Sequence, residues 1–325
     1  MKKKGKGFAA AFYPIGLSGG GDPSQAMIQM QADGTAILTL GSVEIGQGSN
    51  TILAQIAAEE LGLNYEQINV VSADKTNTLF CMGTFASRVT YIAGNAVIEA
   101  AKEVRQILFG MAAGDLGAPP EALEAADGMI RVKEDPQRCK PIADITGASG
   151  GGTVIVGRGA YMKVGAEGEP FCCYTASYAG AYAEVEVDTE TGEVDVTKLI
   201  CVNDVGKAIN PALAEGQIEG GAGMGLGSAL MENRNPGYPN IDYVPTSLAE
   251  YMIPTAVDMP ELEVEMLETG SDGGPYGARA IGEMSSNCQA PAIINAIDDA
   301  IGVLLTSLPA TPEEVLRVLE EKKSE

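Results

Sequence analysis

Two stretches of the chain alternate hydrophobic and polar residues and are interrupted by turn residues. Residues 26–40 (AMIQMQADGTAILTL) predict two strands joined by a turn at Ala32-Asp33-Gly34. Residues 180–204 (GAYAEVEVDTETGEVDVTKLICVND) predict a second hairpin with its turn at residues 189–192. Because alternation with period two is typical of strands with one buried face, we expect each hairpin to pack against helices.

Helical periodicity follows each hairpin. Apolar residues recur every three or four positions, and glycine, asparagine or proline marks several helix ends. Asn210 caps one predicted helix and Pro211 takes its first position, whereas Pro291 fits only the first turn of another. A short strand is expected at residues 67–72, and residues 112–152 are expected to be looser. The predicted helices cover 51–61, a stretch around 89–104, one starting at 210–211, and one starting between 286 and 290.

The order of hairpin, glycine-rich loop and helix occurs twice. This order predicts an α+β fold of two similar αβ subdomains, residues 1–145 and residues 146–325. The first residues, MKKKGKGFAAAFYPIG, have the charge order of a leader peptide. Tyr13, Pro14 and Gly16 interrupt the apolar run, so we expect this segment to belong to the folded protein.

Composition narrows the chemistry. The net charge of −23 argues against nucleic-acid binding, and no apolar run is long enough to predict a membrane span. The six cysteines, including the adjacent Cys172 and Cys173, show no CxxC spacing, which favours free thiols in the cytoplasm. Histidine is absent, which excludes Ser-His-Asp triads and histidine-ligated metals. Acid–base chemistry is left to carboxylates, lysine, tyrosine, cysteine or a cofactor, and no protein-ligated metal is predicted.

Two glycine-containing segments precede helices and are candidate anion sites. The residues 46–48 (GQG) lead into Ser49 and a helix start, where free backbone N–H groups favour an anion. The alternative is a tight turn capped by Ser49 or Asn50. In GTFASRVT, residues 83–90, Arg88 adds a guanidinium fork suited to phosphate. The alternative there is a capped helix with a surface arginine.

Glu283 is the candidate acid–base group. It lies in GEMSSNCQAPAIINAI, just before the last predicted apolar helix, and its neighbours Ile281 and Met284 are apolar. Partial burial raises the pKa of a carboxyl toward values that suit a general base. The alternative is a solvated surface charge. The glycine-rich EGGAGMGLG at 219–227 lacks dinucleotide-binding spacing, so close helix packing is the better interpretation.

Several motifs in order resemble one family. They are GSVEIGQGSNTILAQIAAEELG, GTFASRVTYIAGNAV, AEVEVDTETGEV, NDVGKAINPALAEGQIEGGAGMGLGSALMEN, AEYMIPTAVDMPELEV and GPYGARAIGEMSSNCQAPAIINAI. Together they resemble the molybdenum-cofactor-binding part of the xanthine dehydrogenase and aldehyde oxidoreductase family. The resemblance covers nearly the whole chain and corresponds to the second half of that region. The first half, with its GGFGGK-like loop, is absent.

The resemblance implies a cofactor and a set of site residues. The cofactor is molybdenum with molybdopterin cytosine dinucleotide and a terminal sulfido or selenido ligand, held by the pterin and not by protein side chains. Glu283 corresponds to the general base of the family's GE motif. The implied cofactor-binding residues are Gly46, Gln47, Gly48, Ser49, Thr51, Ala86, Ser87, Arg88, Gln217 and Gly282. The chain departs from the family at Met224, where glutamine is common, and at Arg279, where lysine is common.

The resemblance also implies partners. The chain is similar to the medium molybdopterin subunit of the nicotinate dehydrogenase group, which predicts a heteromeric complex. Its partners are a larger molybdopterin subunit with the first half, an iron–sulfur subunit with [2Fe-2S] centres and an FAD subunit. The expected reaction is hydroxylation of an N-heteroaromatic substrate, nicotinate-like or a purine. The alternatives are an aldehyde oxidoreductase subunit and a non-catalytic cofactor-binding or assembly subunit, which the presence of Glu283 disfavours.

Overall fold

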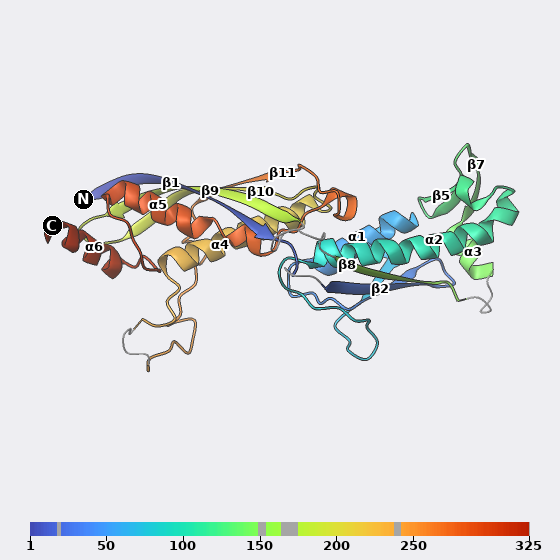
Figure 1. Ribbon diagram of the computed structural model, residues 1–325, viewed down its shortest axis with the longest axis horizontal. Helices are drawn as coiled ribbons and strands as arrows, with labels where there is room; N and C mark the ends of the chain where they lie inside the picture. Colours follow the sequence, from blue (N-terminus) through green and yellow to red (C-terminus); the bar gives the residue numbers. More distant parts are fainter. Residues whose placement is uncertain (18–20, 149–153, 164–174, 237–241, 325) are drawn as a thin grey trace.

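Two sheets, each covered by helices, lie side by side along the long axis of the molecule (Figure 1). The computed structural model describes residues 1–17, 21–148, 154–163, 175–236 and 242–324. The adjacent Cys172 and Cys173 lie outside the described residues. The α+β class predicted from the hairpin–helix order is confirmed.

Sheet A contains the second predicted hairpin. The turn at residues 189–192 is confirmed, and Asn210 caps α4 as predicted, its side chain accepting from the backbone N–H of Leu213 at 3.1 Å. The strand order is β1-β9-β10-β11, with β10 and β11 parallel and the other pairs antiparallel. The strands are β1 (Lys2–Pro14), β9 (Ala176–Asp188), β10 (Val194–Asp204) and β11 (Glu261–Leu267); the helices are α4 (Pro211–Leu230), α5 (Gln289–Ile301) and α6 (Pro312–Ser324).

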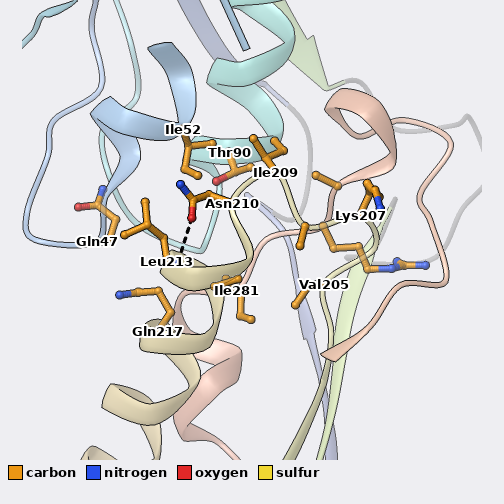
Figure 2. A pocket seen from close by; sticks show the side chains of 14 residues that line it. Gln47, Ile52, Thr90, Val205, Lys207, Ile209, Asn210, Leu213, Gln217 and Ile281 are labelled. Atoms are coloured by element: carbon orange, nitrogen blue, oxygen red, sulfur yellow. Dashed lines mark hydrogen bonds between the residues drawn. The ribbon is translucent and has the colours of Figure 1, made fainter. Parts of the chain in front are cut away.

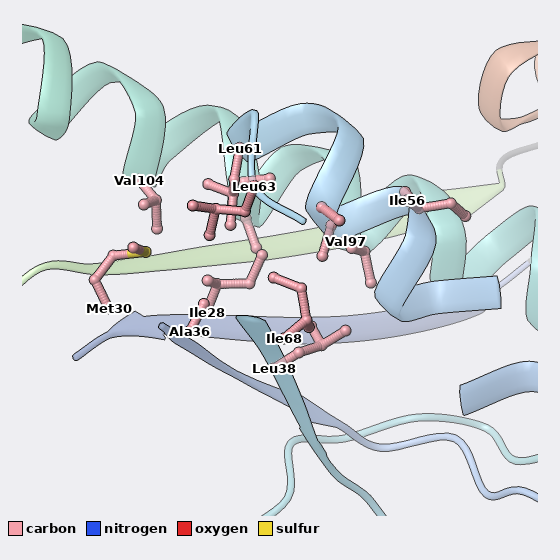
Figure 3. Close-up of a cluster of buried hydrophobic side chains, with 14 of the residues drawn as sticks. Ile28, Met30, Ala36, Leu38, Ile56, Leu61, Leu63, Ile68, Val97 and Val104 are labelled. Carbon is pink, nitrogen blue, oxygen red and sulfur yellow. The ribbon is translucent and has the colours of Figure 1, made fainter. Parts of the chain in front are cut away.

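Sheet B contains the first predicted hairpin. Its order is β4-β3-β2-β8, and two helices cover one face. The core between them is aliphatic; Ile28 and Leu38 of the sheet meet Ile56 and Val97 of the helices (Figure 3). A π-helical turn over residues 89–93 leads into the second helix. The elements are β2 (Asp22–Met30), β3 (Ala36–Leu40), β4 (Ile68–Val71), β8 (Val156–Lys163), α1 (Ser49–Leu61) and α2 (Gly94–Leu116).

The sheets divide the chain differently from the predicted boundary between residues 145 and 146. β1 pairs with β9 along its whole length, from Lys2 opposite Asp188 to Pro14 opposite Ala176, and so joins the later half. β8, from the later half, pairs with β2. The physical reason is edge pairing: the hairpin of β9 and β10 leaves the ladder of β9 open on one side, and the leader-like N-terminal segment fills it.

Of the stretch 112–152, expected to be looser, residues 112–148 form regular elements, and residues 149–152 lie outside the described residues. The helix α2 continues to Leu116, and a small three-stranded sheet follows it at the far end of the molecule (Figure 1). Its strands are too short to show a clear alternation, which explains the miss. The elements are β5 (Leu123–Ala126), β6 (Met129–Val132), β7 (Asp135–Pro141) and α3 (Ile142–Ala148).

The length and apolar composition needed to cross a membrane are not found together in any helix of the described residues.

The packing of β8 on α2 requires glycine at residues 157 and 159, and the closer approach is at Gly159. A Cβ at Gly159 would lie 1.8 Å from the carbonyl oxygen of Ala96, so the backbone would have to move. We predict that Gly159→Ala lowers the free energy of unfolding by about 1–3 kcal/mol or more. Gly114 of α2 has open space around its Cα and is the control. Gly114→Ala should raise the free energy of unfolding by about 1 kcal/mol. Urea denaturation monitored by circular dichroism measures both; equal stability of the two variants would contradict the packing.

Candidate functional site

A cavity of about 450 Å³ lies where the two halves of the molecule meet. Four segments line it: the loop before α1, the loop before the π-helical turn, one side of α4 and the turn before α5. The first two belong to the half with sheet B and the last two to the half with sheet A. We call it the junction cavity. Seven of the predicted site residues line it, namely Gln47, Ser49, Ser87, Arg88, Gln217, Gly282 and Glu283.

Glu283 is the carboxylate of the junction cavity. It begins a short 3₁₀ turn, Glu283–Ser286, directly before α5, in the place that the sequence predicted. The hydroxyl of Ser87, which is 196 residues away in the chain, donates to the carboxylate. The backbone N–H of Glu283 in turn donates to the hydroxyl oxygen of Ser87 at 3.0 Å. Two motifs that the sequence left separate therefore form one hydrogen-bonded unit.

Glycine at position 282 is required for this contact. A Cβ on Gly282 would lie 2.8 Å from the Ser87 hydroxyl oxygen. A larger residue here would force the Ser87 hydroxyl to move away from its position beside Glu283.

Tyr13 is a site residue that the sequence did not reveal. It lies near the end of β1, partly buried and on the opposite strand face from Phe12, and it is close enough to Glu283 for the carboxylate charge to act on its hydroxyl. Burial, together with the negative charge and hydrogen bonding of Glu283, raises the pKa of Tyr13. The phenol therefore stays protonated and can donate to the carboxylate. Only the pairing of β1 with β9 places it there, so no local sequence signal identifies it.

The predicted anion site at the start of α1 is occupied by the chain itself. The carboxylate of Glu44 accepts from the backbone N–H groups of Gly46 at 2.9 Å, Gly48 at 2.8 Å and Asn50 at 3.0 Å. The expectation of free N–H groups here was wrong, and so was capping by Ser49 or Asn50, because Glu44 performs this role. Burial of Glu44 opposes ionisation, but these hydrogen bonds outweigh it and lower the pKa of the carboxyl.

The side chains of this loop, not its backbone, are presented to the cavity. Gln47 accepts from the N–H of Ile45 at 2.6 Å and donates to the Ser49 hydroxyl at 3.0 Å. Gln217 of α4 lies on the same side of the junction, with Leu213 between the two glutamines in the view of Figure 2. Two amides from different halves therefore reach one region. Gly46, Gly48, Thr51 and Ala86 do not line the cavity.

Arg88 is neither a surface charge nor a free phosphate ligand. Its side chain is fully buried, and its Nε lies 2.5 Å from the carboxylate of Asp22, which is also buried. The remaining guanidinium nitrogens donate to the carbonyls of Gly83 at 2.8 Å and Pro23 at 3.0 Å and to the sulfur of Cys81 at 3.0 Å. The fork expected to bind phosphate thus anchors the loop to β2.

The backbone before Arg88 has an unusual conformation. Ala86 and Ser87 have φ values of 48° and 50°, in the left-handed region that costs energy for residues other than glycine. Within the described residues their N–H groups make no hydrogen bond. The anchored Arg88 side chain holds this strained turn in place, and the turn presents two backbone donors.

Met224 and Arg279, the two departures from the family pattern, both lie near the junction cavity. Met224 lines the junction cavity with its side chain 64% exposed. Arg279 lies 3.1 Å from Asp204 and donates to the carbonyls of Ala176 and Gly270, so its charge ties the loop before Glu283 to sheet A. In the part of the chain that the structure describes, no three histidine, cysteine, aspartate or glutamate side chains cluster as a metal site.

Comparisons with known proteins show the family of the chain. Residues 1–260 match the family model of the molybdopterin cofactor-binding domain. The chain is 34% identical to the nicotine 6-hydroxylase large subunit of Paenarthrobacter nicotinovorans, over 90% of this chain and 36% of the relative. It is 30% identical to the xanthine dehydrogenase molybdenum-binding subunit of Escherichia coli O157:H7, over 96% of this chain and 42% of the relative.

A solved structure has the same fold. Quinoline 2-oxidoreductase from Pseudomonas putida 86 superposes with a TM-score of 0.87 at 28% identity, covering 98% of this chain and 42% of that one. The chain therefore belongs to the molybdopterin cofactor-binding family. It spans less than half the length of these relatives.

The Glu44 carboxylate gives a pH-dependent prediction. Its pKa in the folded chain lies below the ordinary value of 4.5, so its stabilising effect is complete above that value and is lost as the pH falls through the folded pKa. We predict that Glu44→Gln lowers stability by about 1 kcal/mol at pH 7, as for loss of a helix cap. The difference from the wild type should shrink below pH 4.5. Denaturation curves at several pH values measure it, and a difference independent of pH would contradict the role of the carboxylate.

Arg88 gives a second prediction. Arg88→Met leaves the Asp22 carboxylate buried without its charged partner, with the backbone N–H of Leu17 still donating to it, and we expect a loss of about 3–5 kcal/mol. Arg317, whose exposed side chain pairs with Glu314 and Glu321 on α6, is the control, and Arg317→Met should change stability by less than about 1 kcal/mol. Chemical denaturation compares the two. If Arg88→Met kept full stability and lost only cofactor, Arg88 would be a phosphate ligand and not a structural anchor.

Proposed function

We propose that the chain is the catalytic molybdopterin-binding subunit of a molybdenum hydroxylase, with Glu283 as its general base. The observation that carries the proposal is the position of this carboxylate on the junction cavity, held by Ser87 and facing Tyr13. The chain offers no histidine, so a carboxylate is the natural base.

The junction cavity fits a molybdenum–pterin cofactor. Its volume is within the range of ligand sites, and Gly220 of α4 has open space around its Cα on the cavity wall. Gln47 and Gln217 offer amides to a polar ring system, and Ser87 of the strained turn lines the cavity and offers its backbone N–H to an anion. We propose these residues as cofactor contacts, with Ser49 beside them, and the cytosine dinucleotide as the cofactor's form. When bound, the cofactor supplies the oxidation chemistry of the hydroxylation.

The side chains around Glu283 prepare it for proton transfer. As general base, Glu283 accepts a proton from the water that supplies the new oxygen atom. The hydroxyl of Ser87 donates to the carboxylate and fixes its orientation toward the cavity, and the protonated phenol of Tyr13 lies close by. The apolar side chain of Ile281, also on the cavity wall, limits water around the carboxylate. This arrangement favours a base with one defined direction of approach.

The proposed substrate is an N-heteroaromatic compound such as nicotinate or a purine. Three relatives in this comparison carry the names of nicotine, xanthine and quinoline enzymes, and all three compounds contain a ring nitrogen. Because the chain spans less than half of these relatives, we propose that a larger molybdopterin subunit carries the remainder. Iron–sulfur and FAD subunits complete a cytoplasmic complex.

Glu283→Gln tests the proposal. An amide keeps the size of the side chain but cannot accept the proton, so turnover should fall by a factor of about 10²–10⁴. The complex should keep its subunits and its molybdenum, as measured by metal analysis. Glu313→Gln, at an exposed glutamate of α6, is the matched control and should keep full activity.

The assay uses the purified native complex with nicotinate, xanthine and aldehydes in parallel, which also distinguishes an aldehyde oxidoreductase. Full turnover of the Glu283→Gln complex would remove the assignment of the base. A complex without molybdenum would favour an assembly role instead.

A further inference from the structure

One face of sheet A is covered by α4 and α5, and the other face carries no helix or strand of the described residues (Figure 1). The pairing register places even-numbered residues of β1 and β9 on this open face. Small residues at odd positions of β1, such as Gly5 and Gly7, face α5 instead. The composition of the open face therefore shows whether water or protein covers it.

The half of the open face near the N-terminus suits water. Lys4 pairs with Glu186 at 2.9 Å, and Lys6 pairs with Glu184 at 3.3 Å. Further across the sheet, Lys198 pairs with Glu261 at 3.4 Å. These charges are mutually compensated and solvated, so this half needs no partner.

The other half of the open face is apolar. Phe8 and Phe12 are 62% and 60% exposed, and Tyr178, opposite Phe12, is 52% exposed. Ile200 and Val202 of β10 continue this surface across the sheet. We call these five residues the aromatic face. Two exposed phenylalanines on one strand face, with only Ala10 between them, are unusual for a surface in contact with water and are typical of an interface.

The aromatic face lies at the end of β1 that is nearer to the junction cavity. Tyr13, the next residue after Phe12, is on the opposite strand face and lies close to Glu283 of the cavity. A protein seated on the aromatic face would therefore cover the end of the strand that carries Tyr13. The relatives carry more than half of their length outside the part that this chain spans. That remainder is the polypeptide with a reason to lie beside the cavity.

We infer that the aromatic face is the docking surface of the larger molybdopterin subunit, and that this contact ends at the charged row formed by Lys6 and Glu184. The inference rests on the proposed split of the molybdenum region between two subunits. The partner surface it requires is apolar, with no charge opposite the phenylalanines, because an unpaired charge buried there would be costly.

The test introduces charge into the aromatic face of the native complex. The double variant Phe8→Glu, Phe12→Glu should weaken association with the larger subunit about tenfold or more, because each buried phenylalanine is replaced by an unpaired carboxylate. Leu304, which is 60% exposed in the loop after α5, provides the matched control, and Leu304→Glu should leave association unchanged. Both side chains are exposed in the single chain, so circular dichroism should show unchanged folding. Association is measured by titrating each tagged variant against the purified larger subunit.

Hydroxyl-radical footprinting of the wild-type complex gives an independent measurement. Phe8, Phe12 and Tyr178 should be protected in the complex, whereas Tyr65, 44% exposed beside sheet B, serves as the unprotected reference.

Unchanged association of the double variant, or full reactivity of the aromatic face, would overturn the inference. The proposed function would stand in that case if the wild-type complex were active. Protection by a second copy of this chain would overturn it in favour of a homodimer. A wild-type chain that binds no larger subunit would remove the proposed function itself.

Discussion

The pairing of β1 with β9 is the contact on which the rest of the molecule depends. It runs from Lys2 to Pro14 and ties the first residues of the chain to the sheet of its second half. The chain must then cross to sheet B and return, so the two halves are connected at more than one point. The junction between them is consequently a defined place where a cavity with fixed walls is able to form.

The junction brings together groups that have different structural supports. Arg88, buried against Asp22, fixes the turn that carries Ser87. Arg279, paired with Asp204, fixes the loop that leads to Glu283. Each ion pair anchors its loop to its own sheet, and Ser87 and Glu283 meet across the gap. The Glu283 carboxylate is therefore positioned from both sides, as the proposed role of a base with a defined direction of approach requires.

The groups predicted to bind phosphate are used for hydrogen bonds inside the protein. The sequence suggested two phosphate ligands, the backbone of residues 46–48 and the Arg88 side chain. Both form hydrogen bonds within the protein instead: the backbone donates to Glu44, and Arg88 donates to the carbonyl of Gly83. This internal bonding holds in place two groups at the cavity, the amide of Gln47 and the strained turn before Arg88. Preorganised donors of this kind bind a ligand without the entropy loss of ordering a loop.

The sequence by itself determined the two hairpins, the starts of α4 and α5, and the place of Glu283 before a helix, because these depend on periodicity and on caps within a few residues. It missed β1 as a strand of sheet A, the filling of the α1 terminus by Glu44, and the place of Tyr13. Those features arise from contacts between segments as far apart as Tyr13 and Glu283. Edge pairing and burial of charge depend on which segments meet, and only the tertiary structure decides that.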